Sequence, residues 1–317
     1  MKIKKIILSV CLFSGLVFVV NAQTSNLEKY ESTIVNPYMG IGYLKFFEKA
    51  YPDITFSKRY DVAKEDWIIT VNVPDSPDNK DGEGRTADFY WANGSFLPEE
   101  ELINKDNYWS LLYSYSKELA DPEKYTDEEK EAIREYSSKE NRENGSGTPM
   151  FLFDFIYESN SRRSLETHIK RISFLGVKTN IHERIKEPLE IIDQKIKELS
   201  LIDSEVRDFL YQIKSADGYL WRIIDGTNRK SFHSLGLAID VLPKNLGRKQ
   251  IFWSWAKDKY PNDWMLVPLK DRWIPPQKVI EIFEENGFIW GGKWIIYDNM
   301  HFEYHPELIE YNFHRED

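Results

Sequence analysis

The chain has 317 residues, of which 41% are hydrophobic, and its formal net charge is -10. This length and apolar content suffice for one sizeable core and leave room for a second, smaller unit. The acidic charge argues against nucleic acid as a partner, because binding to phosphates usually needs a basic surface.

The first 22 residues have the three-part pattern of a secretory signal peptide. Three lysines precede an apolar run over residues 6–20, and a small-residue site follows at Ala22. The run is shorter than the ~20 residues of a membrane-spanning helix, so cleavage after Ala22 is favoured over an uncleaved anchor. Cleavage would remove three lysines and no acidic residue, and would change the net charge from -10 to -13. We expect an exported protein, periplasmic or extracellular, without a membrane anchor.

Residues 23–148 are predicted to form an accessory α+β region. Residues 67–71 have the composition of a strand, and a cluster of turn residues follows them. Thr126 stands three residues before Glu129, which is the pattern of a capping box at the start of a helix. Residues 137–148 are rich in charged residues, Asn, Gly and Ser, and are predicted to be an exposed linker.

Residues 149–202 are predicted to be a helical connector, followed by a catalytic domain over 203–317. Leu189, Ile192 and Ile196 recur at helical spacing, and a second apolar stripe ends at Ile213. In the catalytic domain we expect helices over 248–259 and 277–286 and strands over 237–241, over 294–297 and from His301 onwards. Gly287 is a good stop for the second of these helices.

The segment 231–240 places a histidine, His233, seven residues before Asp240. In a continuous strand two such side chains would point to opposite faces, so they can share a ligand only if the chain bends, and Gly236 allows a bend. An aspartate after the apolar residues 237–239 is costly unless it is paired or bound to a metal. The alternative, an exposed Asp at a turn and an ordinary loop histidine, stays open on this segment alone.

A second segment adds a further imidazole, His301, with Asp298 three residues before it in an aromatic stretch. Two histidines and one carboxylate form a usual catalytic zinc set, which leaves the fourth position open for water. Asp298 is then the nearby carboxylate that takes a proton from that water and passes it to the leaving amine.

These two segments together resemble a known enzyme family. The pattern S-x-H-x-x-G-x-A-x-D, followed by W-G-G-x-W and D-x-x-H-F, is similar to that of VanY-like zinc D-alanyl-D-alanine carboxypeptidases and the related L-alanyl-D-glutamate endopeptidases. The resemblance covers about the last third of the chain. It implies an α+β domain in which a small antiparallel sheet with flanking helices carries the metal, as in the hedgehog signalling domain.

The resemblance also implies roles for individual residues. It gives His233, Asp240 and His301 as ligands of one zinc ion, and Asp298 as the general base. Arg222 matches a position whose arginine binds the substrate or steadies the oxyanion, for which a permanently charged guanidinium is suited. Ser231 either donates a hydrogen bond to a substrate carboxyl or is a structural serine at a turn.

The other histidines and nearby acids are expected to have ordinary roles. His305 is not expected to bind the metal, because its neighbours favour a strand and a proline follows it. Glu303 could orient His301 as a hydrogen-bond acceptor, or it could be a solvated strand residue. His168, His182 and His314 are predicted to lie at the surface.

The predicted substrate is the stem peptide of peptidoglycan, with the cleaved bond left open between D-Ala-D-Ala and L-Ala-D-Glu. The alternative is a zinc-containing module that binds cell wall or signals without catalysis, and the presence of Asp298 argues against it. The sequence gives no indication of the oligomeric state.

Overall fold

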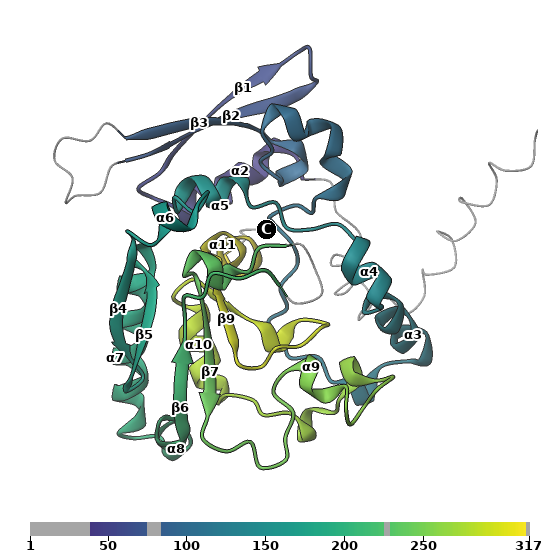
Figure 1. Cartoon of the computed structure of the whole chain (residues 1–317), viewed down its shortest axis with the longest axis vertical. Coiled ribbons are helices and arrows are strands. Elements are labelled where there is room, and N and C mark those ends of the chain that lie inside the picture. Colours follow the sequence, from purple (N-terminus) through teal and green to yellow (C-terminus); the bar gives the residue numbers. More distant parts are fainter. Residues whose placement is uncertain (1–38, 75–83, 225–228, 315–317) are drawn as a thin grey trace, which may run out of the picture.

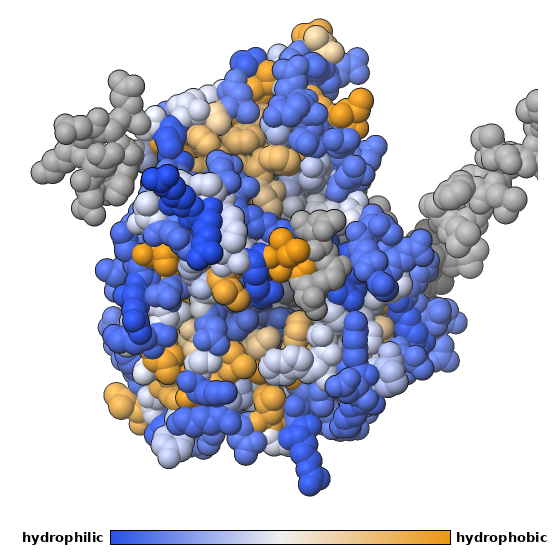
Figure 2. All heavy atoms as spheres, in the orientation of Figure 1, coloured by the Kyte–Doolittle hydropathy of each residue, from blue (hydrophilic) through white to orange (hydrophobic). Residues whose placement is uncertain are grey.

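The computed structural model describes residues 39–74, 84–224 and 229–314 (Figure 1). The predicted signal peptide lies outside these residues. The described part combines helices with three antiparallel sheets, so the predicted α+β class is confirmed. None of its helices has the length and apolar character needed to cross a membrane. On the face seen in Figure 2, hydrophilic residues predominate and hydrophobic ones form small, separate groups.

The N-terminal part contains a three-stranded sheet of order β1-β2-β3, which includes the strand predicted over 67–71. Its elements are α2 (Leu44–Ala50), β1 (Thr55–Asp61), β2 (Asp66–Val73), β3 (Arg85–Tyr90), α3 (Asp127–Tyr136) and α4 (Lys139–Asn144). The capping box of α3 is confirmed, since Thr126 and Glu129 each accept a hydrogen bond from the other's backbone N–H. The linker predicted over 137–148 is wrong in part, because α4 lies within it. The Ser138 hydroxyl caps this helix by accepting from the Asn141 N–H.

The segment predicted as a helical connector contains a β-hairpin as well as helices. Its elements are α5 (Phe151–Ile156), α6 (Arg162–Leu165), β4 (Ile169–Phe174), β5 (Val177–His182) and α7 (Lys186–Ser200). The apolar stripe of α7 is fully buried, as the helical spacing indicates. One hydrophobic core joins this segment to the parts before and after it, through residues such as Phe47, Ile192 and Ile239. The predicted domain boundaries stay predictions.

The C-terminal part is built on a four-stranded sheet of order β6-β7-β9-β8, in which each neighbouring pair is antiparallel. Its elements are α8 (Ser204–Gln212), β6 (Ile213–Asp217), β7 (Ala238–Pro243), α9 (Trp253–Ala256), α10 (Gln277–Glu284), β8 (Phe288–Trp290), β9 (His301–Tyr304) and α11 (Pro306–Phe313). The predicted strands near 237–241 and from His301 are confirmed. So is the predicted helix over 277–286, which ends before Gly287 at φ +85°.

Two predicted elements of this part are wrong. The helix expected over 248–259 is reduced to the single turn α9, because Gln250 pairs its backbone with Asp271 and Trp273 in another segment. The strand expected over 294–297 is absent: these residues follow a 3-10 turn, Gly291–Lys293, that Trp294 closes by donating to the Gly291 carbonyl. Strands β6 and β8 were not expected.

Gly236 is the residue at which the chain turns into β7. Its φ is +70°, a left-handed conformation that non-glycine residues adopt only with strain. A Cβ atom here would lie 2.7 Å from the backbone nitrogen of His182 and 2.8 Å from Ile169 Cδ1. The bend that the sequence requires between His233 and Asp240 therefore depends on glycine both for conformation and for space.

We predict that Gly236→Ala lowers the free energy of unfolding by roughly 2–4 kcal/mol, since backbone strain and a clash with a backbone atom add together. Gly176→Ala is the matched control, because Gly176 also has a positive φ, +82°, but nothing lies within 4 Å of an added Cβ. Gly176→Ala should lower the free energy of unfolding only by the backbone strain, about 1 kcal/mol. Urea denaturation of both variants measures the difference, and equal losses would contradict the steric part of the argument.

Candidate metal centre

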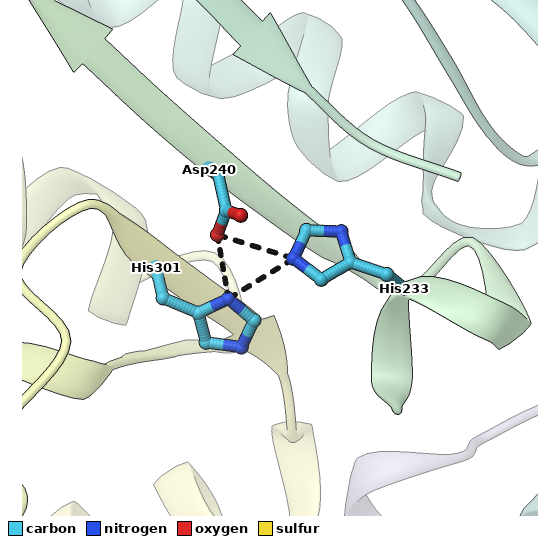
Figure 3. A group of neighbouring side chains, drawn as sticks. All are labelled: His233, Asp240 and His301. Atoms are coloured by element: carbon cyan, nitrogen blue, oxygen red, sulfur yellow. Dashed lines mark hydrogen bonds and ion pairs between the residues drawn. The ribbon is translucent and has the colours of Figure 1, made fainter. Parts of the chain in front are cut away.

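The pairing of β7 with β9 brings Asp240 and His301 together. These residues are directly opposite each other in the antiparallel register. Side chains at opposed positions lie on the same face of a sheet, about 5 Å apart at Cβ. Two residues that are 61 positions apart in the chain thus present a carboxylate and an imidazole at one point (Figure 3).

His233 reaches the same point from outside the sheet. It lies in a 3-10 turn, Phe232–Leu235, that directly precedes β7 and ends at Gly236. The Ser231 hydroxyl caps this turn by accepting a hydrogen bond from the His233 backbone N–H, at 3.3 Å. The turn directs the His233 ring back towards Asp240 (Figure 3).

Three side-chain atoms converge in this arrangement. His301 Nδ1 lies 2.7 Å from Asp240 Oδ1, and His233 Nε2 lies 3.1 Å from the same oxygen. The two ring nitrogens are 3.2 Å apart. The cluster is nearly closed to solvent, because both histidines are buried.

The ring nitrogens that face away from the cluster indicate which tautomer each histidine adopts. His233 Nδ1 lies 2.6 Å from the carbonyl oxygen of Gly218, which can only accept, so this nitrogen carries the proton. His301 Nε2 lies 2.8 Å from Glu303 Oε1 and donates to it in the same way. Neutral imidazoles in these tautomers point two lone pairs at a carboxylate oxygen. A cation fits three such acceptors, and this donor set suits zinc.

The charges around His301 are those of a site that holds a positive charge. Burial by itself would lower the pKa of His301, but Glu303 and Asp240 outweigh it and raise the pKa well above its usual value. Burial would likewise raise the pKa of Asp240, yet hydrogen bonds with His233 and His301 hold it low. Without a metal, the His301 ring is therefore protonated on both nitrogens, between the carboxylates of Asp240 and Glu303.

Asp298 lies beside this cluster, but its carboxyl group has fewer hydrogen-bond partners than that of Asp240. Burial raises the pKa of its carboxyl group to about 7, with a contribution from the charge of Asp240 and opposition from His301. Its Oδ1 is shielded from solvent and has no hydrogen-bond partner among the described residues. A carboxylate that titrates near neutrality with a free acceptor atom is suited to exchange protons.

Asp298 and His301 line a cleft of about 510 Å³. One wall comes from the C-terminal part and includes Arg222, Ser231 and Trp294. The other wall comes from the segment 109–148 of the N-terminal part and includes Tyr136 and Arg142. The two walls meet where Arg229 donates to the carbonyl oxygens of Ser146 and Arg142.

The structure places the two predicted substrate-binding residues in this cleft. Arg222 lines the cleft and is exposed, and its backbone N–H donates to the Ser234 hydroxyl at 2.8 Å. Ser231 is buried and caps the turn of His233, which is the structural role considered for it. Their roles towards a substrate stay predictions.

Among the remaining histidines, the prediction for His182 is wrong. His182 is buried, and its Nδ1 accepts a hydrogen bond from the Arg184 N–H while burial lowers its pKa to about 3. His168 is half-buried between Glu158 and Glu183, whereas His314 is exposed as expected. His305 does not face the three converging atoms but lies between Glu303 and Glu307.

The contribution of the segment 109–148 to the cleft was not expected from the sequence. Its aromatic residues, such as Trp109, Tyr113 and Tyr136, have no spacing that relates them to a site so distant in the sequence. The only available signal was their number in a stretch that is otherwise polar.

Comparison with known families agrees with this geometry. A family described as D-alanyl-D-alanine carboxypeptidase matches residues 225–304, which hold His233, Asp240, Asp298 and His301 but not Arg222. A domain family of unknown function matches residues 43–113. No curated protein and no solved structure matches the chain. The match at 225–304 supports the predicted resemblance to metallopeptidases.

We predict that zinc binding releases about one proton, because the metal takes the place of the proton that His301 shares with its two carboxylates. Below the raised pKa of His301 this proton competes with the metal. The apparent zinc affinity should therefore rise roughly tenfold per pH unit near neutrality and fall as the pH is lowered. Calorimetry in buffers of different ionisation enthalpy counts the protons. An affinity independent of pH would exclude His301 as a ligand.

Proposed function

We propose that this protein is a zinc metallopeptidase that hydrolyses stem peptides of peptidoglycan as a D-alanyl-D-alanine carboxypeptidase. The observation that carries the proposal is the convergence of His233 Nε2, Asp240 Oδ1 and His301 Nδ1 within 3.2 Å of one another, beside a carboxylate with a free oxygen. The family match over the same residues supports it. We further propose that the four-stranded sheet is the metal-site fold shared with the hedgehog domain.

In the proposed reaction each side chain has a separate task. Zinc in such a site supplies a Lewis acid that polarises a carbonyl group and makes water more acidic. Asp298 accepts the proton of the attacking water at its free Oδ1 and returns it to the leaving amine. Trp294, whose ring centroid lies 5.5 Å from that of His301, helps to exclude bulk water from this point.

The cleft offers positive charge to the carboxylate at the end of a stem peptide. Arg222, Arg229 and Lys230 all line it on one side. Lys230 already forms an ion pair with Asp154 at 2.5 Å, whereas Arg222 is exposed. We therefore assign to Arg222 the recognition of the terminal carboxylate or the charge that develops on the cleaved carbonyl, and to Ser231 a hydrogen bond to the same end.

We also propose that the protein acts outside the cytoplasm, in the periplasm or beyond the cell. The support is the charged and apolar pattern of residues 1–22. N-terminal sequencing of the protein from cell fractions tests this, and an intact Met1 in the cytoplasm would contradict it.

Asp298→Asn is expected to lower kcat/KM by roughly 10²–10⁴-fold while the zinc content stays near one per chain, since the amide cannot accept the proton. The measurement is mass analysis of purified muropeptides after digestion. Asp217→Asn is the control, because Asp217 is opposite Asp240 on β6 but does not line the cleft. The unaltered protein is expected to release single alanines. Larger fragments would instead indicate an endopeptidase, and zinc binding without any cleavage would favour a binding module.

The rate should also depend on pH through Asp298. Its raised pKa, about 7, means that the carboxyl is protonated and inactive as a base at lower pH. We predict that kcat/KM rises with pH and levels off at or below pH 7, because a bound dication lowers this pKa further. A rate that falls as the pH rises from acid to neutral would contradict the role of Asp298 as a base.

A further inference from the structure

A chain of hydrogen bonds leads from the metal cluster to the N-terminal part of the molecule; its bonds are part-buried at Glu303 and buried at Glu307. Glu303 Oε1 accepts from His301 Nε2 at 2.8 Å, and Glu303 Oε2 lies 3.2 Å from His305 Nε2. His305 Nδ1 lies 2.6 Å from Glu307 Oε1. Glu307 Oε2 in turn accepts from the Tyr51 hydroxyl at 2.8 Å. Acids and imidazoles alternate along the chain without a break.

Every polar side-chain atom in this row of hydrogen-bonded residues has a hydrogen-bond partner. Both carboxylates bond through both oxygens, and both imidazoles bond through both nitrogens. The exposed fractions of Tyr51, His305 and Glu307 are 4%, 3% and 0%. Water cannot easily replace a lost partner at such depth, so removal of one member leaves a buried acceptor unsatisfied and disturbs its neighbours.

The chain is also held at its middle by packing. The ring of His305 lies 4.5 Å from that of Phe232 and 5.6 Å from that of Phe153, measured between centroids. Phe232 is the residue before His233. The position of His305 is therefore linked to His301 through Glu303 and to His233 through Phe232.

The far end of the chain belongs to a different part of the molecule. Tyr51 directly follows α2, which packs against α11 through contacts such as that between Phe46 and Tyr311. His305, Glu307 and Tyr51 all lie outside residues 225–304, the segment that matches the carboxypeptidase family. The support that they provide therefore comes from parts of the protein outside the matched segment.

We propose that His305, Glu307 and Tyr51 are positioning residues for the metal centre. Through Glu303 they hold the ring of His301 in the tautomer and orientation that direct Nδ1 at the metal, and α2 thereby becomes part of the support of the site. Outer hydrogen-bond partners of a ligating histidine commonly change metal affinity by about 10–100-fold. The effect of a substitution on metal affinity should decrease with each further hydrogen bond between the substituted residue and His301.

The test is the zinc affinity of the full chain, measured by competition with a chromophoric chelator. Glu303→Gln is expected to weaken zinc binding by about 10-fold or more, and Glu307→Gln and Tyr51→Phe by about 3–10-fold. The visible spectrum of the cobalt(II)-loaded protein should shift in the same variants, since it reports the geometry of the ligands and not the stability of the fold.

Tyr115→Phe is the matched control. The Tyr115 hydroxyl also donates to a buried glutamate, Glu284 at 2.5 Å, and it also ties the N-terminal part to the C-terminal part. The Tyr115 hydroxyl bonds to Glu284 and to the Trp290 N–H, and within the described residues neither bond reaches His301. Its loss should therefore lower stability as Tyr51→Phe does but leave the zinc affinity and the cobalt spectrum unchanged.

Three outcomes would overturn the inference. Tyr51→Phe and Glu307→Gln with unchanged zinc affinity would mean that the functional support ends at Glu303. Equal losses in Tyr51→Phe and Tyr115→Phe would mean that the effect is general destabilisation. Because the inference rests on the proposed metal site, the unaltered protein is measured first, and its failure to bind zinc would refute that site together with its support.

Discussion

The antiparallel pairing of Asp240 with His301 is the constraint on which the site depends. A shift of this register by one residue would move His301 to the other face of the sheet and separate the two side chains. The flanking residues oppose such a shift, because Ile239 and Phe302 are fully buried on the other face. The core that stabilises the sheet thus also fixes the ligands, and Gly236 adds the third by turning the preceding segment towards them.

Charge explains why such a cluster is tolerated inside the protein. Glu303 has a pKa of about 2, since His301 and His305 offset the effect of burial, and His305 has a pKa of about 9 between its two carboxylates. Each buried charge therefore faces an opposite one. Asp298 is the exception, with a pKa raised to about 7 and a shielded oxygen that has no hydrogen-bond partner among the described residues. Among the acids of this cluster, Asp298 has the least compensated charge, and the proposed reaction assigns proton transfer to it.

The sequence was most informative where chemistry and spacing coincide, as in the two segments that contain His233, Asp240, Asp298 and His301. It was least informative where a contact joins distant residues. Tyr51 and Glu307 are 256 positions apart, and neither residue type indicates a partner. The same holds for His182, whose burial follows from packing against Tyr157 and Gly236 and not from its polar neighbours in sequence. The strand predicted over 294–297 is absent because Trp294, Ile295 and Ile296 line the cleft instead of pairing with a neighbouring strand.

The most direct test of the account is a crystal structure with data collected at the zinc absorption edge. We predict one anomalous peak at about 2.0–2.2 Å from His233 Nε2, Asp240 Oδ1 and His301 Nδ1, with the Glu303 carboxylate still bonded to His301 Nε2. A peak at another position, or coordination through His301 Nε2, would contradict the proposed metal centre and the support that it receives from the rest of the chain.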